Sequence, residues 1–182
     1  MLYIMRHGQT EWNVLHKMQG RTDVPLNDTG RQMALKAGEE YKSVHFDVCY
    51  CSPLNRALET ARLVLKGRDI PIIIDDRLIE MGFGIYEGLA NSFQIPDCPI
   101  NVVFQEPEKY TQSLGGSETF DELFKRTGEF INEIVEPQLA AGKDILIVGH
   151  ATVNSGIVCQ IKNMPIEEFW NSNHEQCRLL SL

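Results

Sequence analysis

The chain lacks long hydrophobic runs and an excess of basic residues. No segment of its 182 residues approaches the ~20 consecutive apolar residues that a membrane-spanning helix requires, so we expect no membrane partner. Lys and Arg number 17 against 25 Asp and Glu, which gives a formal charge of −8. Because binding to phosphate backbones relies on clustered positive charge, this balance argues against nucleic acid as the main partner. A few arginines focused in one cleft can still bind a small anion.

Paired cysteines and metal-ligand motifs are also missing. The five cysteines are odd in number and scattered, so we predict reduced thiols in a cytoplasmic protein. The first residues lack the apolar stretch of a signal peptide, which agrees with that location. No H-x-H or H-E-x-x-H spacing relates the five histidines, so we expect no metal ion. We expect no organic cofactor either, because none of the chemistry considered below requires one.

Four short apolar runs predict the strands of a sheet, at residues 2–5, 46–51, 70–74 and 144–149. Capping residues followed by apolar residues at helical spacing predict helices that begin at Thr29, Ser52 and Thr119, the last ending before Pro137. A further helix is expected over residues 153–161. Strands that alternate with helices and are apolar throughout predict an α/β fold with a mostly parallel central sheet.

The length favours a single domain over residues 1–182, since domains average about 150 residues. Residues 91–116 are the least patterned stretch, with three prolines and a Gly-Gly pair. We interpret them as an insertion or lid over a site, containing one short helix. The sequence does not indicate an oligomeric state, and a homo-oligomer stays possible.

Two histidines and two arginines lie near the predicted strand ends. Arg6 and His7 follow the first strand, His150 follows the last, and Arg56 lies in the first turn of the helix that begins at Ser52. Ligands of parallel sheets bind beyond the carboxyl ends of the strands. Guanidinium groups near a helix N-terminus favour anions, so this composition predicts a phosphate site.

Several ordered segments resemble the histidine phosphatase superfamily, in its phosphoglycerate-mutase-like branch. They are Arg-His-Gly-Gln-Thr-Glu-Trp-Asn at 6–13, Gln-Gly-Arg-Thr-Asp-Val-Pro-Leu at 19–26, Ser-Pro-Leu-Asn-Arg-Ala-Leu-Glu-Thr-Ala at 52–61, residues 78–88, Gly-Gly-Ser-Glu at 115–118 and Gly-His at 149–150. The matches follow the family's order over nearly the whole chain. The resemblance implies a three-layer α/β/α sandwich.

The same resemblance implies roles for five residues. His7 would be the nucleophile that becomes phosphorylated, Arg6, Arg56 and His150 would hold the phosphoryl group, and Glu80 would be the general acid. The chemistry agrees, because neighbouring guanidinium groups disfavour the imidazolium and keep a histidine nucleophilic at neutral pH. A carboxyl beside a bound phosphate dianion has a raised pKa and can protonate a leaving alkoxide.

The resemblance also places Asn13 on the phosphate and Gln19 nearer the substrate. Glu87 competes with Glu80 as the acid, but we interpret it as structural. Two departures follow the second histidine, where the family commonly has Gly and, five residues on, often Arg. This chain has Ala151 and Ser155, which alter the wall of the pocket or its support and favour a changed substrate preference.

Three functions are consistent with these motifs. The favoured one is a metal-independent phosphomonoester hydrolase acting on a small phosphorylated metabolite through a phosphohistidine. The alternatives are a phosphoglycerate mutase with the same intermediate and a non-catalytic phospho-ligand binding module. Aromatic residues around the predicted lid suggest a partly apolar ester; they are Phe83, Tyr86, Phe93, Phe104 and Tyr110. The remaining histidines and both tryptophans are interpreted as hydrogen-bonding, surface or packing residues; they are His16, His45, His174, Trp12 and Trp170.

Overall fold

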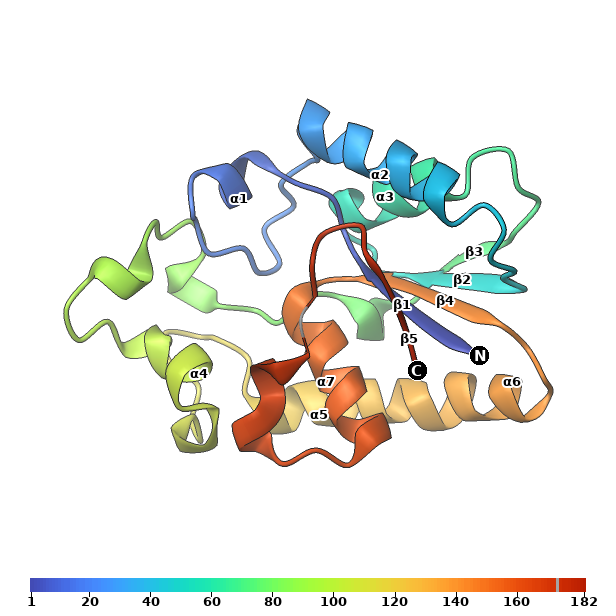
Figure 1. The fold of residues 1–182 in the computed structure, drawn as a ribbon. Helices are drawn as coiled ribbons and strands as arrows, with labels where there is room; N and C mark the ends of the chain where they lie inside the picture. The colour runs from blue at the N-terminus through green and yellow to red at the C-terminus, as the bar shows by residue number, and fades with distance from the viewer. Residues whose placement is uncertain (173) are drawn as a thin grey trace.

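A five-stranded sheet lies at the centre of the protein in a computed structural model that describes residues 1–172 and 174–182 (Figure 1). Its strands are β1 (Leu2–Arg6), β2 (Val48–Cys51), β3 (Ile72–Ile74), β4 (Ile145–Gly149) and β5 (Leu179–Ser181), in the order β3-β2-β4-β1-β5. The first four pair in parallel, whereas β5 runs antiparallel to β1. The prediction of a mostly parallel sheet is confirmed. The three-residue β5 was not predicted, because so short a run carries no periodicity.

Helices cover both faces of the sheet, as the α/β/α sandwich requires (Figure 1). On one side lie α2 (Asp28–Glu40) and α3 (Asn55–Val64), and on the other lie α5 (Phe120–Phe130), α6 (Glu136–Ala140) and α7 (Ala151–Lys162). Two separate apolar clusters fill the two interfaces, with Ile4 in one and its neighbour Met5 in the other. Successive residues of a strand point to opposite faces, so β1, β2, β4 and β5 contribute to both clusters, whereas the edge strand β3 contributes only Ile72 to one of them.

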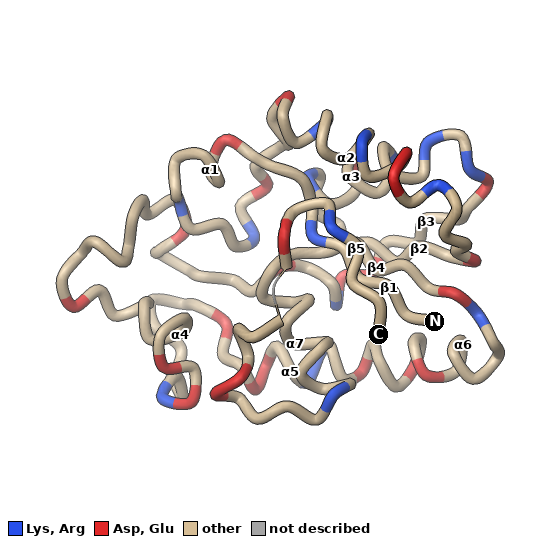
Figure 2. Tube along the Cα trace, in the orientation of Figure 1, with Lys and Arg blue, Asp and Glu red and all other residues tan. Residues whose placement is uncertain are grey.

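The shorter elements connect these layers. They are α1 (Glu11–Val14), α4 (Val102–Gln105), the π-helical η6 (Ile131–Val135), and the 3-10 helices η1 (Asp76–Leu78), η2 (Gly84–Tyr86), η3 (Ser92–Gln94), η4 (Pro99–Asn101), η5 (Pro107–Lys109) and η7 (Ile166–Asn171). Among the described residues, no helix is long and apolar enough to cross a membrane. Acidic residues are dispersed around the trace and do not gather in one region (Figure 2).

Two predicted helix starts are wrong by a few residues. Helix α2 is capped by Asn27, whose side chain accepts the Gly30 N–H at 2.8 Å, and not by Thr29. Helix α3 begins at Asn55 without a side-chain cap, since Leu54 is at the N-cap position; the Ser52 hydroxyl lies 2.7 Å from His150 Nε2 and accepts the Leu54 N–H at 3.3 Å. The capping box at Thr119 is confirmed, with reciprocal side-chain bonds to the third helical residue.

The helix that begins after Thr119 was predicted to end before Pro137, and this is wrong. The chain passes from α5 through the π-helical turn η6 directly into α6, which carries Pro137 in its first turn. Proline is tolerated there because the N–H groups of a first turn need no partner inside the helix. Helix α7 likewise starts two residues earlier than predicted, immediately after His150.

Residues 91–116 fold as consecutive 3-10 turns around the short helix α4. Ile100, Val103 and Tyr110 of this stretch are buried in the same apolar cluster as β1 and α7. The stretch is therefore anchored in the core. Its role as a lid, and the single-domain boundary, stay predictions.

Close backbone packing between residues 8–9 and the first turn of α2 gives a test of this fold. A Cβ at Gly30 would lie inside van der Waals contact of the Gln9 carbonyl, whereas a Cβ at Gly156, also helical, meets Leu123 at an ordinary 3.4 Å. We expect Gly30→Ala to lower the free energy of unfolding by roughly 2 kcal/mol or more, since a backbone must shift. Gly156→Ala should change it by less than about 1 kcal/mol, as helix propensity offsets the new contact. Urea unfolding measures both, and equal effects would contradict this packing.

Candidate active site

The residues after β1, β2 and β4 meet at one edge of the sheet. Parallel pairing sets Arg6 beside Gly149 and Cys51 beside Val148, so the next residues His7, Ser52 and His150 are brought together. The rings of His7 and His150 contact edge to face, with centroids 5.1 Å apart. This juxtaposition is the one predicted from the strand ends.

His7 is buried, and its ring orientation is fixed by the backbone. Its Nδ1 lies 2.7 Å from the Gly8 carbonyl oxygen, which can only accept a hydrogen bond, so Nδ1 carries the proton. Burial, and then the charges of Arg56 and Arg6, hold the pKa of His7 well below its usual range. The neutral ring therefore keeps a lone pair on Nε2, which is the state that a nucleophile requires.

His150 is fully buried against His7. Its Nε2 lies 2.7 Å from the Ser52 hydroxyl, and burial followed by the Arg56 charge lowers its pKa well below the usual range. It is not among the described residues that line the adjoining cavity, and its ring contacts that of His7.

Arg56, in the first turn of α3, is fully buried and braces a loop. Its two Nη atoms donate to the carbonyls of Thr22 at 2.9 Å and Gly20 at 2.7 Å. Arg6 donates through Nη1 to the His174 carbonyl at 3.3 Å. Burial lowers the pKa of both guanidinium groups, but arginine stays charged at neutral pH.

Three buried polar atoms at this centre have no hydrogen-bond partner among the described residues. They are Arg6 Nε, Arg56 Nε and His150 Nδ1. A buried donor without a partner costs about 1–3 kcal/mol, which an anion bound between these groups would relieve. Their chemistry fits a phosphoryl group.

Glu80 is buried beside the start of α7. Its carboxylate accepts the backbone N–H groups of Met81 at 2.8 Å, Thr152 at 3.2 Å and Val153 at 3.1 Å. Burial raises the pKa of Glu80 above its usual value, although these hydrogen bonds and the Arg56 charge oppose the shift. A carboxyl group with a raised pKa is suited to carry a proton.

Asn13 and Gln19 are oriented by hydrogen bonds to their carbonyl oxygens. Asn13 Oδ1 accepts from the Thr10 N–H at 2.9 Å and from Gln176 Nε2 at 2.8 Å. Gln19 Oε1 accepts from the Thr10 hydroxyl at 2.9 Å. This leaves the amide N–H groups of both side chains as donors in the cavity wall.

A cavity of about 940 Å³ adjoins these groups, and six of the seven predicted site residues line it, all except His150. One wall is aromatic: the Phe104 ring lies 5.7 Å from Phe83, 5.6 Å from Phe93 and 5.3 Å from Trp170 between centroids. Of the aromatic residues expected here, Tyr110 is instead buried, with its hydroxyl bonded to Ser117. Tyr86 is not among the described lining residues either.

The sequence interpretation missed several residues of this cavity. Trp170, Trp12 and His16 line it, as does the segment His174–Gln176 that precedes β5. That segment reaches the site because Gln176 pairs with Arg6 and the Cys177 N–H donates to the Arg6 carbonyl at 2.9 Å. Burial and the Arg6 charge lower the pKa of His174 to about 4. No motif marks this segment; only the unpredicted pairing of β5 with β1 brings it here.

Glu87 has the structural position expected for it. Its carboxylate accepts the N–H groups of Arg21 at 2.9 Å, Thr22 at 2.8 Å and Phe83 at 3.1 Å. It thereby holds the same loop that Arg56 braces.

The two departures from the family pattern differ in position. Ala151 lines the cavity, whereas Ser155 is fully buried and its hydroxyl lies 3.2 Å from that of Ser172. Ser155 thus supports the segment that leads to His174.

One group of three candidate metal ligands occurs within the described chain, at His45, Asp47 and Asp144. It lies at the amino ends of β2 and β4, opposite the cavity. The N-terminal amine contacts Asp144 at 2.8 Å and Lys143 contacts Asp47 at 3.6 Å, so cations of the chain already accompany both carboxylates.

The fold and these groups define an α/β protein with a histidine–arginine anion site at the carboxyl ends of its parallel strands. A family model, "Histidine phosphatase superfamily (branch 1)", matches residues 2–182, and the chain belongs to this superfamily.

Individual relatives carry both mutase and phosphatase names. The chain is 31% identical over 170 residues to a 2,3-bisphosphoglycerate-dependent phosphoglycerate mutase of Cytophaga hutchinsonii, covering 92% of this chain and 80% of the relative. It is 25% identical over 170 residues to phosphoserine phosphatase 1 of Hydrogenobacter thermophilus, covering 93% and 80%. The solved structure of Bacillus stearothermophilus YhfR superposes with a TM-score of 0.86 at 34% identity, covering 98% of this chain and 88% of that one.

The buried neutral histidines predict that acid weakens the protein. The pKa values of His7 and His150 are lowered in the folded state, so their stabilising effect is complete above the unfolded value near 6.5 and is lost as the pH falls below it. Between pH 7.5 and 5 this amounts to roughly 2 kcal/mol for each histidine that stays neutral.

Urea unfolding of the wild type and of His7→Gln at both pH values measures this effect. Protonation of Glu80 acts in the opposite direction but is common to both proteins, so the difference isolates His7. We expect the variant to lose about 2 kcal/mol less than the wild type over this range. An identical loss of unfolding free energy in the two proteins would show that His7 has the same pKa in the folded and unfolded states.

Proposed function

We propose that the protein is a phosphomonoester hydrolase that acts through a phosphohistidine at His7. The observation that supports this best is the neutral His7 ring, fixed through Nδ1, in one cavity with Arg6, Arg56 and Glu80. Family membership supports phosphoryl chemistry at a histidine. The choice of hydrolysis over phosphoryl isomerisation is argued below.

In the first half-reaction, His7 Nε2 attacks phosphorus and the bond to the ester oxygen breaks. The leaving oxygen takes the proton of Glu80 as the N–P bond forms, so an alcohol departs. In the second, Glu80 removes a proton from water, whose oxygen attacks phosphorus while the N–P bond breaks. Inorganic phosphate is released, and His7 and protonated Glu80 are restored.

The fixed donors stabilise the charge that is transferred. Arg6 and Arg56 supply permanent charge at the phosphoryl oxygens, and the amide groups of Asn13 and Gln19 add neutral donors. Because the chain itself braces these groups, little reorganisation accompanies the reaction.

The cavity favours hydrolysis of a partly apolar ester over a mutase reaction. A mutase substrate bears a second anionic group, which needs its own cations. Beyond Arg6 and Arg56, the one Lys or Arg among the described lining residues is Lys17, whose ammonium lies 5.7 Å over the Trp12 ring. The lining also includes the aromatic group around Phe104. The proposed substrate is therefore a small monoester with an apolar portion. We also propose a cytoplasmic location, which agrees with the five buried and unpaired cysteines.

Hydrolysis of p-nitrophenyl phosphate in the presence of EDTA tests the proposal. We expect the wild type to release p-nitrophenol at a rate that EDTA leaves unchanged, since none of the proposed steps uses a metal ion. His7→Ala should lose at least about 10³-fold, because the nucleophile is gone. His45→Ala, at the opposite edge of the sheet, is the matched control and should retain full activity.

Phosphoglycerate interconversion, measured on the same samples, distinguishes the alternatives. Interconversion faster than phosphate release would establish a mutase. Absence of both activities, with retained binding of inorganic phosphate, would indicate the non-catalytic module.

A pH profile tests the assignment of the acid. His7 must be neutral and its pKa is lowered, so the acidic limb lies below 6.5. Glu80 must be protonated and its pKa is raised, so activity should fall with rising pH along a limb that lies above 4.5. We expect kcat/KM for benzyl phosphate to peak below pH 7.

Glu80→Gln should remove the alkaline limb and lower the rate on benzyl phosphate by about 10²–10⁴-fold, the usual contribution of a general acid. A wild-type rate that still rises at pH 9 would refute the role of Glu80.

A further inference from the structure

Glu80 lies on a segment without regular structure. Residues 79–83 connect η1 to η2 and belong to no strand or helix, so no ladder of backbone hydrogen bonds fixes them. A general acid must nevertheless be held to within a fraction of an ångström of the leaving oxygen. Contacts from outside the segment have to supply that precision.

Three backbone carbonyls, one just before this segment and two within it, accept hydrogen bonds from residues outside it. Arg126 Nη1 donates to the Arg77 carbonyl, Arg21 Nε donates to the Glu80 carbonyl at 3.4 Å, and the Glu118 N–H donates to the Gly82 carbonyl at 2.8 Å. The bonds fall before, at and after Glu80. They therefore fix the path of the chain that carries its side chain.

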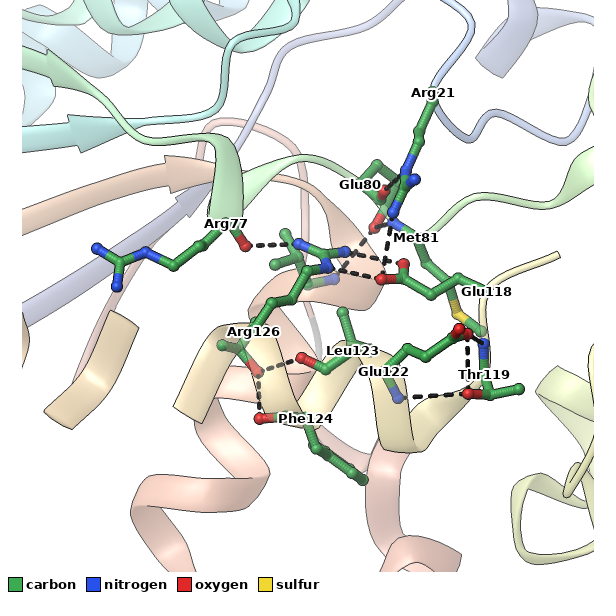
Figure 3. A network of polar contacts seen from close by, with 12 residues as sticks. Arg21, Arg77, Glu80, Met81, Glu118, Thr119, Glu122, Leu123, Phe124 and Arg126 are labelled. Carbon is green, nitrogen blue, oxygen red and sulfur yellow. Dashed lines mark hydrogen bonds and ion pairs between the residues drawn. The ribbon is translucent and has the colours of Figure 1, made fainter. Parts of the chain in front are cut away.

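The three donors are joined through one buried carboxylate, that of Glu118 (Figure 3). Arg126 binds it in a bidentate fashion, with Nε 2.7 Å from Oε1 and Nη2 3.0 Å from Oε2. Arg21 Nη2 lies 3.2 Å from the same Oε1. Only 7% of the Glu118 side chain and 15% of the Arg126 side chain are exposed. Glu118 thus links the helix α5, the 20–22 loop and the Glu80 segment.

We propose that Glu118 and Arg126 are positioning residues that hold Glu80 in register for proton transfer. This role rests on the hydrolase function proposed above. A buried ion pair contributes little net stability, because desolvation cancels most of its attraction. Its planar, bidentate geometry instead fixes direction, and the remaining Nη1 of the same guanidinium reaches the Arg77 carbonyl.

The proposal predicts a dependence on the leaving group. p-Nitrophenolate is a stable anion and leaves without a proton, whereas the alkoxide from benzyl phosphate needs one. A displaced Glu80 therefore slows phosphoryl transfer from benzyl phosphate to His7 more than transfer from p-nitrophenyl phosphate, and kcat/KM measures this first half-reaction. Loosening of the whole site would slow both reactions alike.

Arg126→Lys is the decisive variant. It keeps the positive charge and the fold, but one ammonium cannot bind both Glu118 oxygens and the Arg77 carbonyl. Glu118→Gln keeps the shape and the backbone bond to Gly82 while removing the charge. Glu122→Ala is the matched control, because it breaks the capping box of the same helix without touching residues 77–83.

For Arg126→Lys and Glu118→Gln we expect kcat/KM for benzyl phosphate to fall at least about 10-fold more than kcat/KM for p-nitrophenyl phosphate, because kcat/KM reports the first half-reaction. Amide hydrogens of residues 77–83 should exchange faster with solvent in both variants, and Glu122→Ala should show neither effect. Equal losses on the two esters, or the same selective loss in Glu122→Ala, would overturn the positioning role.

Hydrogen exchange keeps the two proposals separable, since it does not depend on turnover. If the wild type cleaves neither ester, the hydrolase function fails. Unchanged protection of residues 77–83 in Arg126→Lys would then reject the positioning role on its own evidence.

Discussion

The parallel pairing of β4 with β1 and β2 is the constraint on which the site depends. The His7 N–H donates to the Gly149 carbonyl at 3.0 Å and the Ser52 N–H donates to the Val148 carbonyl at 3.1 Å. These bonds extend the ladder one residue beyond the strands. They place His7, Ser52 and His150 at a common height, where the edge-to-face contact of the two histidine rings follows from strand register.

The same strand register also brings several buried charged and titratable side chains into a small volume. Two guanidinium groups, two imidazoles and a carboxyl are withdrawn from water, and all but His150, which lies against the Ser52 hydroxyl, have a hydrogen bond with the backbone. Arg56 donates to loop carbonyls, His7 to Gly8, and Glu80 accepts from the start of α7. Hydrogen bonds with the main chain therefore fix the orientation of these side chains. Burial shifts the pKa values of His7 and Glu80 more than the neighbouring charges do.

Much of this arrangement could be predicted from local pattern. The four parallel strands are apolar runs with clear ends, and the turn residues after them identify the site edge. The capping box at Thr119 is a short-range signal, and the helix start predicted from it is confirmed. The predicted helix end before Pro137 was wrong, because a π-helical turn places this proline at the start of a new helical segment and no local sequence rule predicts such a turn. The sequence did not predict that His174–Gln176 line the cavity. Their position depends on the three-residue strand β5, whose pairing with the distant β1 leaves no local sequence signal.

Arg56 combines two roles that different residues often have in enzymes, the proposed binding of an anion and the support of a loop. Its guanidinium lines the cavity of the proposed phosphate site and also donates to the carbonyls of Gly20 and Thr22, while Glu87 accepts the Thr22 N–H. Loss of this arginine in a descendant would remove anion binding and loosen the loop together. The His7 side chain, by contrast, is hydrogen-bonded only to the carbonyl of its neighbour Gly8 among the described residues and packs on the His150 ring. Under the proposed function, loss of activity with retention of the fold is therefore easier through His7 than through Arg56, and a descendant without His7 would keep the proposed phosphate pocket.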